Sequence, residues 1–558
     1  MLSVKEELVV SREDLSAAVA CFPNLTHLHL SDNSVETLND VFLARLASSC
    51  PKLTRLHVGR SFAHPPKEGD VHPVKEYRRK EGHSITTNGL DCFFLKLLRL
   101  EELSLFCLHQ ATQLPDSFFQ LKHLHTLVVN NAAALENPGF TNLTALTTLC
   151  VTFPWNSQHL STLRHFPRLT HLSTVARHHN HQPAGAASVT LPSCLKLINF
   201  FYLCPEFDTI FPSASPFTGL EELLITQCRE LENLPDDIGD LLPSLRKLTI
   251  RECFHLETLP ESFTSLNRLE ALIISISDAF SLPDNFGNLP ALKLLVLEEL
   301  QFRALPPSFC HLTEGPPHVV DISRLSHLRV LKLTCVGVRC GRVVRRRLSC
   351  LQQLEQLEMR LEGGRQELPV PLTFLPRLRS LLIEAPGIRR LPVNMAAALP
   401  QLRQLQLLSW SHKGLPSSIV ELSSLTSLTV EAPQLKSLPQ GMTSLVRLRK
   451  LELIRCNALR HLPESLTQLH QLILRNTSML SLPANLVRLT EFQFQIRTCF
   501  SCTDSHTKAP TILSPSSLAP GSASASPIPT SIPQLQAVAG QWEGSEAAGR
   551  GVKLLPGE

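Results

Sequence analysis

The stretch from Leu378 to Pro483 repeats one phrase five times, as LRSLLIEAPGIRRLP, LRQLQLLSWSHKGLP, LTSLTVEAPQLKSLP, LRKLELIRCNALRHLP and LHQLILRNTSMLSLP. Successive copies are 24, 23, 23 and 21 residues apart, because they begin at Leu378, Leu402, Leu425, Leu448 and Leu469. A near-constant period with leucines at fixed places predicts a stack of repeats, each of which contributes one β-strand. This stretch sets the expected architecture of the chain.

The fourth copy shows how one repeat uses its side chains. Leu451 and Leu453 are two residues apart, so in a strand they point to the same face. Glu452 and Ile454 then point to the opposite, open face. Cys456 stands where a small thiol side chain can fit under the next coil. One repeat cannot bury its own leucines, whereas stacked neighbours bury a continuous core.

The same phrase occurs in regular or degenerate form along most of the chain, which gives about 19 repeats. The five copies above are joined by one later start, Leu489, and by earlier starts at Leu25, Leu53, Leu100, Leu124, Leu146, Leu169, Leu195, Leu220, Leu245, Leu269, Leu292, Leu328 and Leu354. We expect residues 25–500 to form one repeat domain, with inserts near 59–88 and 310–324.

The two ends of the chain differ from the repeats. Residues 1–24 are expected to form an N-terminal cap, as a short amphipathic helix or lid, because a terminal repeat exposes one face of the core. Residues 501–558 are rich in Ser, Pro and Ala and lack a periodic apolar pattern. Such a segment buries too little apolar surface to offset chain entropy, so we predict a disordered tail.

Two neighbouring copies carry a more specific pattern. LEELLITQCRELENLP at Leu220 and LRKLTIRECFHLETLP at Leu245 both fit LxxLxIxxCxxLxxLP. They resemble the repeats of intracellular plant immune receptors of the nucleotide-binding leucine-rich-repeat class, and also Ras-group-related and Ras-scaffold leucine-rich-repeat proteins. The NxLxGxIP pattern of extracellular plant repeats is absent. The period and the resemblance together predict an α/β leucine-rich-repeat solenoid, a curved horseshoe with a parallel β-sheet on its concave face.

The sequence lacks the motifs that would indicate an enzyme or a nucleotide switch. It contains no GxxxxGK[ST] loop, kinase signature, GxSxG elbow or HExxH helix. We therefore expect no catalytic residue and no cofactor. The net charge of +4 over 558 residues is too small to indicate nucleic-acid binding by itself.

The compartment is predicted from the N-terminus and the cysteines. MLSVKEELVVSREDL has charges where a signal peptide needs an apolar core. No uncharged apolar run is long enough for a membrane span. The 16 cysteines are scattered along the chain, which favours reduced thiols packed in a core. We expect a cytoplasmic protein, and a monomer.

Three clusters contain side chains that could carry chemistry, but their context does not indicate a functional site. His171, His178, His179 and His181 lack the cysteine partners of structural zinc sites, and a chain with 23 histidines forms such groups by chance. Cys499 and Cys502 form a CxxC without the βαβ context of a redox motif. The arginine run Arg339–Arg347 could dock an acidic partner or serve as a nuclear address, but a solvated return loop is favoured. No metal site is expected.

The remaining candidate is the open face of the sheet. The residue six places after each repeat start is expected to face outward, and this column mixes acidic and basic side chains. Part of it is expected to form solvated cross-strand pairs. Arg and Trp are favoured at binding hot spots, so we predict a protein-binding surface there. Its candidate residues are Arg251, Glu298, Arg360, Glu384, Trp410, Glu431 and Arg475.

The expected function is that of a non-catalytic scaffold that binds a protein partner on the concave face. The resemblance implies a role in immune or signalling recognition. The alternative is the sensor fragment of a nucleotide-binding leucine-rich-repeat receptor whose ATPase module is not in this chain.

Overall fold

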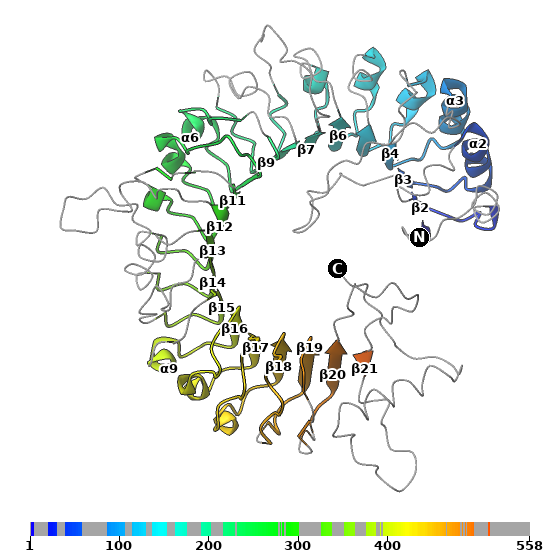
Figure 1. Cartoon of the computed structure of the whole chain (residues 1–558). Coiled ribbons are helices and arrows are strands. Elements are labelled where there is room, and N and C mark those ends of the chain that lie inside the picture. Colours follow the sequence, from blue (N-terminus) through cyan, green and yellow to red (C-terminus); the bar gives the residue numbers. More distant parts are fainter. Residues whose placement is uncertain are drawn as a thin grey trace. The chain divides into compact units, whose positions relative to one another are not determined.

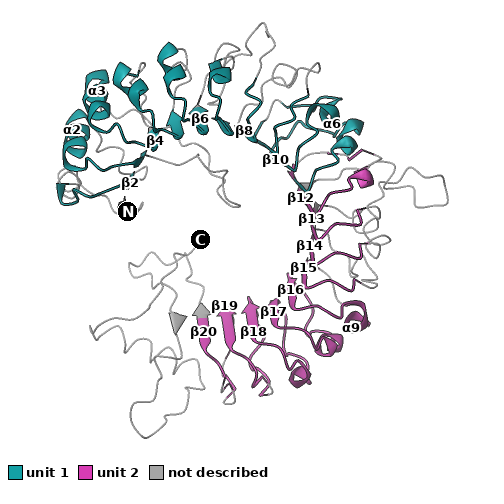
Figure 2. Ribbon diagram, turned by 180° about the vertical axis from the view of Figure 1, so that it is seen from behind, with its two compact units in different colours: residues 1–272 teal, residues 273–558 magenta. Residues whose placement is uncertain are grey.

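A computed structural model of the chain shows two compact units, residues 1–272 and residues 273–558, and each is described by itself (Figure 2). The described residues are 2–4, 20–30, 39–58, 86–105, 114–129, 137–152, 162–175, 191–201, 216–228, 231–276, 280, 282–283, 286–300, 325–336, 351–362, 375–386, 391, 394–464, 466–479, 482–483, 486, 488–495 and 512–513.

Several sequence predictions concern residues outside these ranges. They are the greater part of both inserts, most of the expected cap, the arginine run Arg339–Arg347, nearly all of the tail, His178, His179, His181, Cys499 and Cys502.

Parallel strands form the sheet of unit 1, and each begins two residues after a repeat start. Every strand from β2 to β9 is hydrogen-bonded to the next one in the sequence. The strands are β2 (His27–Leu30), β3 (Arg55–Val58), β4 (Glu102–Leu105), β5 (Thr126–Val129), β6 (Thr148–Thr152), β7 (His171–Val175), β8 (Leu197–Phe201), β9 (Glu222–Thr226) and β10 (Lys247–Arg251).

Unit 2 continues the same pattern after β11 (Ala271–Ser275), which contains the boundary between the units. Its sequential parallel strands are β12 (Leu294–Leu300), β13 (Val330–Val336), β14 (Gln356–Glu362), β15 (Ser380–Glu384), β16 (Gln404–Leu408), β17 (Ser427–Glu431), β18 (Lys450–Ile454), β19 (Gln471–Arg475) and β20 (Glu491–Gln495). Over the described residues, the nineteen strands β2 to β20 correspond one to one with the repeats counted in the sequence.

The predicted alternation of side chains is present in the strands. Leu451 and Leu453 of β18 are fully buried, and Leu451 lies in register with Leu428 of β17 and Leu472 of β19. Because parallel strands stack without a shift here, inward leucines of neighbouring repeats meet directly and form the core. The leucine-rich-repeat solenoid with a parallel sheet is confirmed.

The return segments lie on the side of each unit opposite its strands and are short (Figure 1). They include α2 (Asp40–Ser49), α3 (Thr87–Lys96), α6 (Ile238–Leu241), α9 (Met395–Ala398) and the 3₁₀ turns η2 (Asp116–Gln120), η4 (Pro138–Asn142), η5 (Leu163–His165), η6 (Glu261–Ser265), η7 (Phe286–Asn288), η10 (Ser417–Glu421) and η11 (Met442–Ser444). A proline with φ near −65° directly precedes η2, η6 and η10, so the backbone has a fixed φ where each turn begins.

Phenylalanines fill the core under the return segments of unit 1. Phe94, Phe118 and Phe140 are fully or almost fully buried. Their rings meet at centroid distances of 5.2 Å (Phe94–Phe118) and 5.8 Å (Phe118–Phe140), and the first pair is edge-to-face. Aromatic rings bury large areas and favour this geometry, so the degenerate repeats of unit 1 are held by more than leucine.

Two residues after β9, β10 and β18 the chain holds a buried cysteine, as predicted for the repeat cysteines. The thiol of Cys456 donates to the backbone oxygens of Val430 (3.7 Å) and Ile454 (3.4 Å), so it ties one repeat to the preceding one. Cys228 and Cys253 occupy the same position and are also buried. Burial raises the pKa of the Cys456 thiol to about 11, so this thiol is protonated at neutral pH.

Three boundaries differ from the sequence predictions. Residues Leu2–Val4 form a strand, β1, parallel to β2, where a helix or lid was expected; pairing satisfies the free backbone edge of β2. Within the expected tail, Ile512–Leu513 form β21, which pairs antiparallel with β20. α3 begins at Thr87, inside the expected first insert, because the Thr86 hydroxyl accepts a hydrogen bond from the Gly89 N–H and caps the helix.

Candidate interaction surface

The first, third and fifth residues of each strand point away from the core, and we call the surface they form the sheet face. The predicted column is its fifth-residue row. Thr334, Arg360, Glu384 and Leu408 are cross-strand partners on β13 to β16, and Glu431, Ile454 and Arg475 are partners on β17 to β19. The strand register therefore aligns most of the unit 2 candidates in one row.

Arg360 is held by two carboxylates of the sheet face. Its guanidinium lies 2.9 Å from Glu358 of the same strand and 3.3 Å from Glu384 of β15. Lys332 of β13 approaches Glu358 from the other side at 3.6 Å. The Glu358 side chain is only 13% exposed, so this network is better shielded from water than an ordinary surface ion pair.

Arg475 belongs to a second network of the same kind. Its Nε lies 3.5 Å from Glu452, and Lys450 contacts that carboxylate at 3.6 Å. The Glu452 side chain is 11% exposed although it points outward, because its long neighbours cover it. In both networks one shielded glutamate in the third-residue row holds a lysine and an arginine.

Glu431 is paired through a backbone feature of the repeats. Arg455, the residue after β18, has a left-handed conformation (φ 50°) and lies 3.0 Å from the Glu431 carboxylate. Its N–H donates to the Arg475 oxygen at 2.8 Å, so the turn is fixed by the next repeat. Left-handed backbone costs a non-glycine residue roughly 1–2 kcal/mol. The same conformation occurs at Gln227, Glu252, Ser409 and Asn476.

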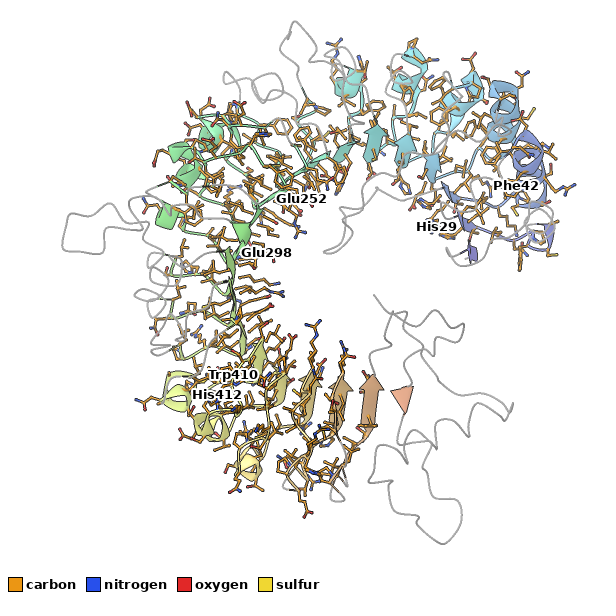
Figure 3. All side chains as sticks on the ribbon, in the orientation of Figure 1. His29, Phe42, Glu252, Glu298, Trp410 and His412 are labelled. Atoms are coloured by element: carbon orange, nitrogen blue, oxygen red, sulfur yellow. The ribbon has the colours of Figure 1, made fainter. Side chains whose placement is uncertain are left out.

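Two candidates have no ion pair to a described residue. Arg251 of β10 is half-buried, and its Nε, although buried, has no hydrogen-bond partner among the described atoms. Glu298 lies on β12 (Figure 3) and is also half-buried. Its backbone oxygen accepts a hydrogen bond from the Ile276 N–H at 3.3 Å. Arg251 belongs to unit 1 and Glu298 to unit 2.

Trp410 does not lie on the sheet face, which corrects its inclusion among the candidates. The side chain is only 2% exposed, and its indole N–H donates to the Gly414 oxygen at 3.2 Å (Figure 3). Trp410 follows Leu408 by two residues, as Cys456 follows Ile454, so it occupies the same inward position as the repeat cysteines. That offset was available in the sequence and identifies Trp410 as a core residue.

The partners of the candidate arginines were not among the residues predicted from the sequence. Lys332, Glu358 and Glu452 lie in the third-residue row, two places before the predicted column, and period-two alternation also turns them outward. Lys450 lies in the first-residue row and Arg455 at the turn. The alternation in the sequence already indicates that these side chains face outward. Which of them form ion pairs depends on how far each side chain reaches.

The sheet face of unit 1 carries a group of titratable residues near β2. His57 of β3 lies 3.1 Å from a Glu102 oxygen, and the Arg55 Nε lies 3.3 Å from the other oxygen. The rings of His29 and His57 meet edge-to-face at 6.1 Å. Burial lowers the pKa of His57, and the carboxylate of Glu102 opposes that shift. His57 is therefore held toward its neutral form.

Neither a metal site nor a membrane span is found in the part of the chain that the structure describes. No three His, Cys, Asp or Glu side chains converge there as ligands, and His171 lies on β7. No described helix has the length and apolar character needed to cross a bilayer.

Comparison with known proteins finds leucine-rich repeats in part of the chain. A family model described as "Leucine-rich repeat region" matches residues 220–408, and no curated protein matches the chain. A solved leucine-rich-repeat protein of Leptospira interrogans shares 18% identity at a TM-score of 0.37, with 86% of this chain and 95% of that one covered.

Two further solved structures are similar at comparable levels. The leucine-rich-repeat ectodomain of the Arabidopsis thaliana receptor kinase GASSHO1/SCHENGEN3, in complex with CASPARIAN STRIP INTEGRITY FACTOR 2, shares 17% identity (TM-score 0.35), covering 86% of this chain and 56% of that one. The functional domain of InlJ from Listeria monocytogenes shares 13% identity (TM-score 0.37), covering 72% and 74%.

Proposed function

We propose that this leucine-rich-repeat protein is a non-catalytic scaffold that binds a protein partner on the sheet face of unit 2. The observation that carries the proposal is the fixed position of Arg360 and Arg475, each held by a shielded glutamate. Arginine is a favoured hot-spot residue, and a side chain already ordered in the free protein loses less entropy on binding.

The biological setting is part of the proposal. The LxxLxIxxCxxLxxLP repeats at Leu220 and Leu245 lie inside the region that the family model matches, and their resemblance to intracellular immune-receptor repeats supports a role in defence or signalling. The buried cysteines Cys228, Cys253 and Cys456 are thiols rather than disulfides, which supports a reducing, cytoplasmic location.

The second candidate is the sensor part of a nucleotide-binding receptor. It is favoured by the two cysteine-bearing repeats at Leu220 and Leu245, in which the Cys228 and Cys253 thiols donate to the backbone oxygens of Phe200 and Ile225, each at 3.9 Å. A transcript that encodes an in-frame GxxxxGK[ST] loop upstream of this chain supports the sensor; a transcript without it supports the scaffold.

The proposal is tested with a pair of matched double variants of the full chain. The face variant is Arg360→Gln with Arg475→Gln; the control is Arg168→Gln with Arg268→Gln, at exposed positions just before the first leucine of two unit 1 repeats. Both remove two positive charges. Glutamine is preferred to glutamate because a reversed charge would oppose the shielded carboxylates of Glu358 and Glu452.

Folding should survive in the face variant, since Lys332 remains beside Glu358 and Lys450 beside Glu452. We expect the melting temperature to change by no more than about 2 °C. Affinity capture from native extract with mass spectrometry should recover a partner with wild type and control but not with the face variant. Equal recovery by all three places the binding site elsewhere and overturns the proposal.

A further inference from the structure

A row of basic side chains runs along one edge of the unit 2 sheet, at the residue directly after the first leucine of each repeat. We call it the start row. Backbone hydrogen bonds of 2.8–2.9 Å join each member to the next, so the row is continuous. Neighbouring members are about 4.8 Å apart, the spacing of paired strands. The members are Lys293, Arg329, Glu355, Arg379, Arg403, Thr426, Arg449, His470 and Thr490.

The start row of unit 2 has an excess of positive charge. Five of its nine members are Lys or Arg, and Glu355 is the single acidic member. The equivalent row of unit 1 has no such excess, because its basic members Lys196 and Arg246 are outnumbered by Glu101, Glu221 and Glu270. Lys196 pairs with Glu221 at 3.1 Å and Arg246 with Glu270 at 3.5 Å. The excess is therefore specific to unit 2 and is not a general property of the repeat.

Two triplets of the start row differ in whether a carboxylate lies between their two arginines. In the first, the Glu355 carboxylate lies between two guanidiniums, 4.0 Å from Arg329 and 3.6 Å from Arg379. In the second, Arg403 and Arg449 stand at the same two-strand separation on either side of Thr426. The Thr426 hydroxyl donates to the Arg403 backbone oxygen at 3.0 Å and supplies no negative charge.

Among the described residues, the arginines of the second triplet have no acidic partner. Arg403 and Arg449 are exposed, and no described carboxylate lies within 4.0 Å of either guanidinium. The arginines of the sheet face, by contrast, are already paired with glutamates. Exposed Arg447 and Arg488, just before the first leucines of their repeats, extend the basic strip.

We propose that the start row of unit 2 binds an acidic polypeptide segment, with one carboxylate held between Arg403 and Arg449 as Glu355 is held between Arg329 and Arg379. Guanidinium groups match carboxylates in shape and charge. Single-stranded nucleic acid would require aromatic side chains for base stacking, and the described residues of this row include no Phe, Tyr or Trp. The residues of the start row are not those of the sheet face, so its test does not depend on the function proposed above.

The sharpest test is Thr426→Glu in the full chain, which would place the chain's own carboxylate between the two arginines. A companion variant, Arg403→Gln with Arg449→Gln, removes them. The matched controls are Thr147→Glu, at the same repeat position in unit 1, and Arg168→Gln with Arg268→Gln. The probe is a fluorescein-labelled oligoglutamate peptide, measured by fluorescence anisotropy at low salt and at 0.15 M salt, because exposed ion pairs weaken with screening.

We expect both start-row variants to weaken peptide binding by about tenfold or more, since two or three exposed ion pairs are lost together. The controls should stay within about twofold of wild type. Equal weakening in the controls would show a general charge effect, and unchanged binding in Thr426→Glu would show that the carboxylate does not lie there; either overturns the proposal. Single-stranded RNA or phosphatidylserine vesicles that bind more tightly than the peptide, and through the same arginines, would also overturn it.

Discussion

Leu451→Ala should cost roughly 3–5 kcal/mol of stability, toward the upper part of the range for buried leucine truncations. The Leu451 side chain is fully buried, and so are its register partners Leu428 and Leu472. Hydrogen bonds to β17 and β19 fix the backbone of β18 on both sides, so the surrounding core has little freedom to collapse into the space. When the surrounding core cannot collapse into the cavity, the whole cavity remains and lowers the free energy of unfolding further.

Native-state hydrogen exchange on the full chain measures both the size and the reach of this effect. Because each repeat contacts only its neighbours, protection should fall mainly between residues 425 and 474. Val446→Ala, at a side chain that is 70% exposed, is the control and should change stability by no more than about 0.5 kcal/mol. Uniform loosening from β2 to β20, or a cost below about 1 kcal/mol, would refute the reasoning.

Three further predictions follow from named contacts. Burial raises the pKa of the Cys150 thiol to about 12 and of the Cys456 thiol to about 11, so iodoacetamide at pH 8 should label exposed Cys92 and spare both, as read by mass spectrometry. Burial lowers the pKa of His57, so the unfolded chain binds more protons than the folded chain, and stability should fall as the pH drops through the ordinary histidine range. Between pH 7 and pH 5.5, His57→Gln should therefore lose less melting temperature than wild type. An equal loss in the two proteins would contradict this. Trp410→Phe removes the donor to Gly414 and should cost about 0.5–1.5 kcal/mol in urea unfolding while leaving partner recovery unchanged.

The strand positions were predictable from the sequence because one leucine period sets both the strand and its inward face. Leu451 and Leu453 point inward wherever a parallel stack forms, and no long-range information is needed to place them. The same logic failed at Leu2–Val4, where a strand stands in place of the expected helix. Three residues carry no period, and their conformation is decided by the free edge of β2.

The candidate surface was predictable only in part. The column that contains Arg360, Glu384 and Arg475 followed from counting along each repeat, since register carries it across the sheet. Whether those side chains are free or paired depends on neighbours in a second row, such as Glu358 and Glu452, and on side-chain rotamers. Trp410 was misplaced because residue type was given more weight than its offset within the repeat.

β1 and β21 bear on whether copies of this chain can join end to end. A stack of near-identical repeats that ended on a bare parallel strand would offer a ready template for the first strand of another molecule, and growth of that kind need not close. In unit 1 the three-residue β1 occupies that place beside β2, and in unit 2 the two-residue β21 lies beside β20 with reversed direction. Short or reversed strands are poor templates for a further parallel strand. We therefore expect these two end strands to disfavour end-to-end growth of the chain into fibres.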